Sequence, residues 1–174
     1  MPIKFKVVLV GSPEQQKGLL SIDEEDIKKG EKYQTNLGLD FKLEYKLLED
    51  KNINLVIWLM KGEKYREIQQ HFYEGADGLL VLFDASQDID GIVSRILELR
   101  TSSPYSSILL IGKNIKNRIN QIVENFTLEL IKEGKIKDKV DLNIDFFDIA
   151  DKERLAADDL LDFLAKKLLR RTKY

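Results

Sequence analysis

The alternation of apolar and polar residues between positions 37 and 47 is the clearest structural signal in this sequence. Leucine or an aromatic residue stands at every odd position of that stretch, and glycine or a charged residue at every even position. A period of two predicts a half-buried β-strand. The polar run Glu49–Asn52 and the apolar run Ile53–Met60 follow it, so the segment predicts an antiparallel β-hairpin.

Short apolar runs alternate with helical patterns through the rest of the chain. Four further strands are predicted at Phe5–Val10, Leu79–Phe83, Ile108–Ile111 and Val140–Phe147. Helices are predicted at Pro13–Ile22, Glu63–Tyr73, Ile89–Leu99, Ile119–Leu130 and Leu160–Leu169. Strands that alternate with helices indicate βαβ crossovers. The expected fold is therefore α/β, with a six-stranded, mostly parallel sheet, one antiparallel edge strand, and helices on both faces.

Length and composition exclude several classes of protein. The 174 residues predict a single domain over residues 1–174. The 28 Lys and Arg nearly balance the 30 Asp and Glu, giving a net charge of −2, so no nucleic-acid partner is expected. The chain has no cysteine, so we expect no disulfides, no cysteine-bound zinc and no prenylation. No apolar run reaches the roughly 18–20 residues of a membrane span, and no signal peptide is evident. We therefore expect a cytoplasmic protein without a stable membrane anchor.

Three segments carry a family resemblance. Residues 65–86 read YREIQQHFYEGADGLLVLFDAS, residues 37–41 read LGLDF, and Ile57-Trp58 follow in the second hairpin strand. They resemble, in order, the Rab segment after the second switch, the Rab strand Ile-Gly-Val-Asp-Phe, and the Ile-Trp that precedes Asp-Thr-Ala-Gly. The chain thus resembles a Ras-like small GTPase, closest to the Rab branch. The resemblance covers nearly the whole chain and implies the three-layer Ras-like fold of P-loop NTPases.

The phosphate-binding loop of that family is degenerate here. Ligands bind at the carboxyl ends of the strands in such sheets, and the first strand ends at the loop GSPEQQKG, residues 11–18. Gly11 and Lys17 are in register with the family motif. Gln16 replaces its second glycine, and Gly18 replaces the hydroxyl that holds Mg²⁺. This degenerate Walker A motif implies, at most, a vestigial nucleotide site.

The remaining nucleotide motifs also depart from the family. Leu59 replaces the metal-side Asp, Asn36 stands at the Mg²⁺-linked Thr, and the water-positioning Gln is deleted or replaced. Asn114 remains in the base-recognition run, but Lys116 or Asn117, depending on the register, replaces the guanine-reading Asp. Phosphoryl transfer relies on these groups for positioning and charge stabilisation. The resemblance therefore implies a pseudo-GTPase with no catalytic residues, no metal and no cofactor, whose vestigial site retains Gly11, Lys17 and Asn114.

Two features of the loop have alternative interpretations. Ser12 and Pro13 at the start of a helix, with Gln15 at its third position, form a capping signal. One hypothesis is that the helix begins early and caps itself in place of a phosphate; the other is an ordinary strand–helix turn. Lys17 is either an anion contact or an exposed lysine retained by ancestry.

Aromatic residues suggest where a partner would bind. Phe41, Trp58 and Phe72 match the aromatic triad through which Rab proteins meet effectors, and Tyr65 and Tyr73 would extend the same patch. The alternative is that these rings are packed in the hairpin and helix core. The resemblance implies a protein partner at the switch-region surface, with roadblock or longin-type proteins expected by family analogy.

These observations predict a catalytically inactive, Rab-like homologue that serves as a protein-interaction or scaffold module in trafficking or signalling. The alternative is a divergent small GTPase that binds GTP or GDP weakly or without Mg²⁺ and hydrolyses GTP slowly. A third interpretation is a different anionic small molecule bound between Gly11 and Lys17.

Overall fold

The computed structural model describes residues 1–12, 32–34, 39–60, 71–83, 86–112, 115–133, 143–149 and 153–172. Its strands are β1 (Ile3–Val10), β2 (Lys32–Gln34), β3 (Leu39–Leu48), β4 (Lys51–Met60), β5 (Gly78–Leu82), β6 (Ser107–Gly112) and β7 (Ile144–Asp148). Its helices are α4 (Ile89–Ser102), α5 (Lys116–Lys132) and α6 (Glu153–Arg171). Residues 71–73 are also helical. The helix predicted at Pro13–Ile22 lies outside the described residues, as does most of the one predicted at Glu63–Tyr73.

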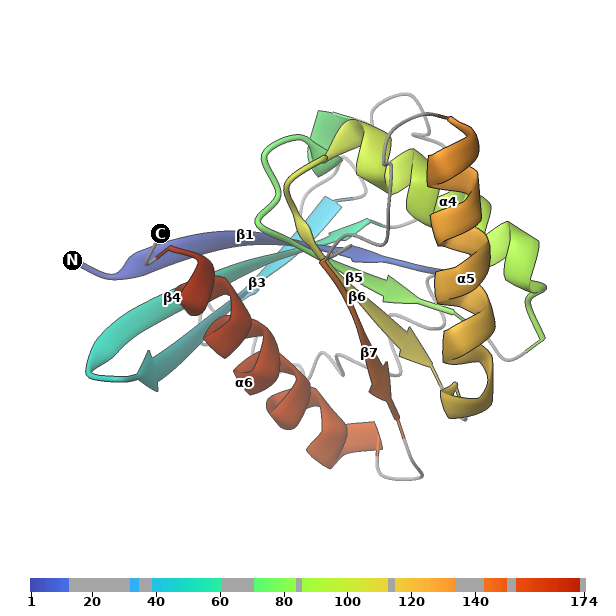
Figure 1. Cartoon of the computed structure of the whole chain (residues 1–174). Coiled ribbons are helices and arrows are strands. Elements are labelled where there is room, and N and C mark those ends of the chain that lie inside the picture. The colour runs from blue at the N-terminus through green and yellow to red at the C-terminus, as the bar shows by residue number, and fades with distance from the viewer. Residues whose placement is uncertain are drawn as a thin grey trace.

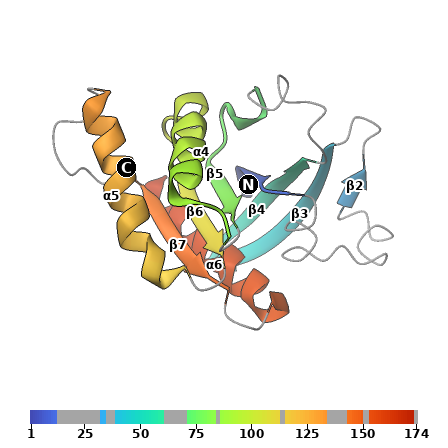
Figure 2. The same cartoon turned by 90° about the vertical axis from the view of Figure 1, so that its right-hand side faces the viewer.

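The strands form one sheet in the order β2-β3-β4-β1-β5-β6-β7. All neighbours from β4 to β7 are parallel, while β3 runs antiparallel to both β4 and β2. The α/β class and the hairpin are confirmed, and a strand is present in each of the six predicted segments, of which residues 37–38 and 140–142 lie outside the described residues. The three-residue strand β2 adds a seventh at the edge (Figure 2), so the antiparallel strand β3 lies one place inside the edge.

A two-residue turn sets the register of the hairpin. Glu49 and Asp50 connect β3 to β4 and have φ angles of 49° and 58°. Two consecutive positive φ angles are the geometry of a type I′ turn, whose twist matches that of the flanking strands. The turn brings Leu48 opposite Lys51, and every later pair, including Phe41 and Trp58, follows from it.

Two hydrophobic clusters cover the sheet, one on each face. Figure 1 shows α6 against one face and α4 with α5 against the other. The α6-side cluster includes Phe5, Val7, Leu9, Ile53, Leu55, Ile57, Leu59, Leu109, Leu164 and Leu168. The α4/α5-side cluster includes Val8, Val10, Tyr73, Ile96, Leu99, Ile108, Leu110, Ile122 and Phe126. Because central strands contribute to both clusters, β1, β5 and β6 need the nearly continuous apolar runs seen in the sequence.

The two helices α4 and α5 begin differently. Asp88 caps α4, and its Oδ1 accepts a hydrogen bond of 2.6 Å from the backbone N–H of Gly91. Helix α5 begins at Lys116, three residues before the predicted start, without a side-chain cap. In the described part of the chain, no helix is long and apolar enough to cross a membrane.

Candidate functional site

The first candidate site is the end of the sheet that is formed by the carboxyl ends of the parallel strands. Gly11 follows β1 directly and is half-buried, while Ser12 is exposed. Backbone hydrogen bonds tie the neighbouring strand ends together: Phe83 donates to Ile111 at 3.0 Å and Ile149 donates to Gly112 at 2.9 Å. Lys17 and Asn114 lie outside the described residues. Of the three residues assigned to a vestigial nucleotide site, the structure therefore describes only Gly11, which lies where the topology predicts.

Gly112 marks a close approach of the chain at this edge. A Cβ atom on Gly112 would lie 2.6 Å from Ile115 Cγ2 and 3.1 Å from the carbonyl oxygen of Phe83. Ile115 is 1% exposed and belongs to the α4/α5-side cluster. Glycine is therefore required here so that Ile115 can pack beside the end of β6. The role of Ile115 could not be predicted from the run Lys113–Asn117, because nothing in that run shows that Ile115 packs against Gly112.

Leu59 lies in the core. It is 2% exposed, belongs to the α6-side cluster, and pairs in register with Leu9 of β1 and Asp40 of β3. An apolar side chain in this position offers no oxygen ligand to a cation. Among the described residues, no group of three or more His, Cys, Asp or Glu side chains is arranged to hold a metal ion.

The second candidate site is the aromatic triad. Phe41 and Trp58 are cross-strand partners with ring centroids 5.3 Å apart, and Trp58 and Phe72 are 6.0 Å apart. Both separations are typical of interacting aromatic pairs. All three rings are only partly buried, and Trp58 and Phe72 also pack against the α4/α5-side cluster. The structure therefore brings the triad together, half in the core and half at the surface. Tyr65 lies outside the described residues.

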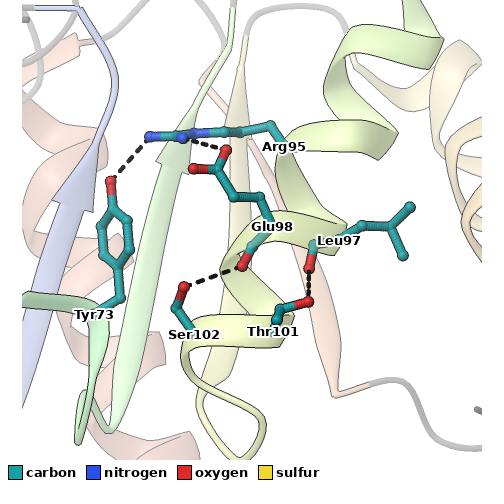
Figure 3. Close-up of polar contacts among 6 residues, drawn as sticks. All are labelled: Tyr73, Arg95, Leu97, Glu98, Thr101 and Ser102. Atoms are coloured by element: carbon teal, nitrogen blue, oxygen red, sulfur yellow. Dashed lines mark hydrogen bonds and ion pairs between the residues drawn. The ribbon is translucent and has the colours of Figure 1, made fainter. Parts of the chain in front are cut away.

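Tyr73 does not belong to this surface. Its side chain is fully buried, and its hydroxyl accepts a hydrogen bond of 2.9 Å from Arg95 Nη2 of α4 (Figure 3). Arg95 also pairs with Glu98 at 2.6 Å, and its guanidinium lies 5.8 Å from the centre of the Tyr73 ring. Burial raises the pKa of Tyr73 above its ordinary value, against the opposing charge of Arg95. The assignment of Tyr73 to the partner surface is corrected: this residue joins the segment before β5 to α4.

The charged residues of β3 face α6. Lys42, Glu44 and Lys46 pair in register with β4 residues whose side chains belong to the α6-side cluster. Lys42 and Glu44 form an ion pair of 2.7 Å, and Lys46 forms one of 2.8 Å with Asp162 of α6. Burying a charged group without a partner is unfavourable in free energy. The ion pairs reduce this penalty, so the charged side chains of β3 can lie against the core.

The ion pair with α6 also affects the ionisation of Lys46. Burial alone would lower the pKa of Lys46, but the hydrogen bond from Lys46 to Asp162 and the nearby carboxylates outweigh it and raise that pKa. Lys46 therefore remains charged, and it links the hairpin to the terminal helix.

The apolar residues of β3 consequently face away from α6. They share the side of the sheet on which Phe41 meets Trp58. Tyr45 is 59% exposed and Leu47 is 69% exposed. We call the surface formed by Phe41, Leu43, Tyr45, Leu47, Val56 and Trp58 the hairpin face. The period of two in the sequence predicted the strand, with one apolar and one charged face. It could not show that the apolar face of β3 lies partly in solvent.

A comparison with known protein families agrees with this architecture. A family model described as the Ras family matches residues 6–170 of the chain. The match begins in β1 and ends at the last turn of α6, so it spans both candidate sites.

Proposed function

The chain belongs to the Ras family, and we propose that it is a Rab-like, catalytically inactive member that acts by binding a protein partner. The observation that carries this proposal is the orientation of β3, which directs a row of apolar side chains outward and its charged side chains toward α6. Exposed, contiguous apolar surface is typical of protein interaction sites.

The composition of the hairpin face supports a protein as its ligand. Trp58 and Tyr45 are residue types enriched at the energetic centres of protein interfaces. Trp58 is braced by Phe41 and Phe72, so little side-chain entropy would be lost when a partner covers it. A partner with a complementary apolar surface fits best, and a roadblock or longin-type protein in a cytoplasmic trafficking or signalling assembly is our specific suggestion.

The absence of GTP turnover is the second part of the proposal. Leu59, which the resemblance aligns with the family's metal-side Asp, is packed in the core. The loop at residues 11–18 lacks the Mg²⁺-linked hydroxyl, and the run after Gly112 lacks the guanine-reading Asp. Phosphoryl transfer without these groups loses both its metal and the positioning of its substrate.

A second candidate function rests on Gly11 and Lys17. Gly11 lies directly after β1, where the family's phosphate-binding loop begins, and Lys17 keeps its place in the motif. These residues would suit a divergent GTPase that holds GTP or GDP weakly, without Mg²⁺, and hydrolyses GTP slowly.

The nucleotide content of the purified protein distinguishes the two functions. The protein is denatured and the released small molecules are separated by chromatography. We expect no GDP or GTP above the buffer control, whereas a nucleotide-dependent protein would release either in amounts approaching one per chain. A thermal shift with GTP, measured with Mg²⁺ and with EDTA, then tests weak binding, because a ligand that binds only the folded state raises its stability.

A further inference from the structure

A groove lies between β7 and the C-terminal half of α6. It is near the amino ends of the parallel strands, whereas Gly11 lies at their carboxyl ends. Its volume is about 670 Å³, within the range of small-molecule sites. We call it the basic groove; its lining includes Asp145 of β7 and, from α6, Phe163, Lys166, Lys167, Arg170 and Arg171.

The spacing of the α6 residues explains how they converge. Relative to Phe163, the four cationic residues stand at +3, +4, +7 and +8, which is the spacing of one helix face. The intervening Leu164 and Leu168 are buried in the α6-side cluster. Packing of the leucines against the sheet therefore fixes the rotation of α6 and presents the cationic face beside the open edge at β7.

Among the residues that the structure describes, cations outnumber carboxylates in the lining of the basic groove. Four cations and one carboxylate line it, which leaves three positive charges. Lys167 pairs with Asp145. Arg171 donates to Ser107 Oγ at 2.9 Å and to the Tyr105 carbonyl oxygen at 2.6 Å. Both acceptors are neutral, so these bonds fix the guanidinium of Arg171 without neutralising it.

The other two cations face solvent. Lys166 and Arg170 are exposed and make no ion pair within the described part of the chain. A further cation lies nearby: Arg100 is held by the carbonyl oxygens of Pro104 and Ser106. Burial, together with the charge of Arg171, lowers the pKa of Arg100. The guanidinium groups of Arg100 and Arg171 are therefore both bonded to residues 104–107, beside the basic groove.

The helix dipole accounts for only part of this arrangement. Cations are favoured in the last turn of any helix, which explains Arg170 and Arg171 individually. It does not explain a concave site in which a half-exposed aromatic ring, Phe163 at 41% exposure, lies beside them. A lining of several cationic side chains and one aromatic ring suits a ligand that has an anionic part and a carbon skeleton.

We propose that the basic groove binds a phosphate ester with at least two negative charges. Lys166, Arg170 and Arg171 contact the phosphate oxygens, since lysine and arginine are the usual partners of phosphate groups. Phe163 packs against the carbon skeleton of the ligand. The site lies at the amino ends of β6 and β7, whereas Gly11 follows the carboxyl end of β1, so Gly11 is not part of it.

Titration with pyrophosphate, followed by NMR of the full chain, tests the proposal. We expect saturable shifts of the backbone amides of residues 166–171. The variant Lys166→Glu/Arg170→Glu should bind pyrophosphate at least tenfold more weakly. The control Lys4→Glu/Lys51→Glu makes the same change in net charge at two exposed lysines on β1 and β4, and it should bind as the wild type does. Circular dichroism checks that both variants are folded.

Co-sedimentation distinguishes a membrane-borne ligand from a free one. Phosphatidylcholine vesicles containing phosphatidylinositol 4,5-bisphosphate would sediment the wild type, but not the groove variant, if the ligand is a lipid headgroup. Binding of pyrophosphate without sedimentation would assign the groove to a soluble phosphate ester. The proposal is overturned if wild-type protein binds neither probe, if the shifts map to residues 11–12 instead, or if the control variant weakens binding as much as the groove variant.

Discussion

The rings of Phe41 and Trp58 lie 5.3 Å apart across the β3–β4 hairpin, on the face opposite the ion pairs of β3. Trp58 in turn meets Phe72, 6.0 Å away, next to the α4/α5-side cluster. The pair therefore connects the packed interior to the exposed end of the hairpin, where Tyr45 and Leu47 lie. A partner that covers Trp58 would find a continuous apolar surface extending toward the turn.

Polar substitutions of Tyr45 and Leu47, at the exposed end of the hairpin face, should weaken binding to that face without destabilising the fold. Tyr45→Ser/Leu47→Ser should change the free energy of unfolding by no more than about 0.5 kcal/mol per site, because both side chains are largely in solvent. It should also reduce binding of a hydrophobic dye. Urea unfolding and dye fluorescence measure the two effects.

The matched control for this variant is Tyr105→Ser/Leu128→Ser, which removes the same residue types at positions that are 84% and 48% exposed elsewhere. It should leave dye binding nearly unchanged. Equal losses of dye binding in the two variants would show that the hairpin face binds the hydrophobic dye no better than the rest of the surface does.

The ion pair of Lys46 and Asp162 should couple the hairpin to α6. We expect a double-mutant cycle with Lys46→Met and Asp162→Asn to give a coupling energy of about 0.3–1 kcal/mol, since the carboxylate is partly exposed. The coupling should fall in about 1 M salt. Urea unfolding of the four proteins measures it, and a coupling of zero at low salt would argue that the charged side of β3 does not hold α6.

Tyr73 should contribute to stability through its hydroxyl. Tyr73→Phe removes the hydrogen bond from Arg95 while keeping the buried ring, so we expect a loss of about 0.5–1.5 kcal/mol. Arg95 is partly exposed, so water can satisfy its freed donor. Tyr105→Phe, at an exposed tyrosine, should have almost no effect. If both substitutions cost the same in thermal or urea unfolding, the bond of Tyr73 to Arg95 is not stabilising.

The same tyrosine predicts a pH dependence at alkaline pH. The pKa of Tyr73 in the folded state is raised above its ordinary value of 10.0, so the folded state holds this proton more tightly than the unfolded state does. Its contribution to stability is fully present below about pH 10 and is lost as the pH rises through the folded-state pKa. Between pH 9 and 11, wild type should lose more stability than Tyr73→Phe; parallel losses in urea unfolding would contradict the shift.

The fold could be predicted from the sequence because its signals are local. The apolar runs of β1, β5 and β6, the period of two in β3, and the helical spacing in α4, α5 and α6 each depend on residues close in the chain. Strand β2 was missed because three residues carry no periodicity. Strand β7 begins at Ile144, after Asn143 with φ of 51°, and residues 140–142 of the predicted strand lie outside the described residues.

The candidate sites were harder to predict, since they depend on which face of an element meets which neighbour. The resemblance brought Phe41, Trp58 and Phe72 together correctly. It also assigned Tyr73 to the surface, because adjacent aromatic residues in a sequence do not reveal that one of them turns toward Arg95. The basic groove required both the rotation of α6 and the position of β7, and neither can be derived from the terminal lysines and arginines alone.

Affinity capture under three nucleotide conditions tests the central claim most directly. Immobilised wild type and Tyr45→Ser/Leu47→Ser are each exposed to cell extract with GDP, with a non-hydrolysable GTP analogue, and with EDTA, and the bound proteins are quantified by mass spectrometry. We predict one set of partners that wild type retains equally in all three conditions and that the variant loses. Partners that bind wild type only with the GTP analogue, or that bind the variant equally well, would contradict a nucleotide-independent partner site on the hairpin face.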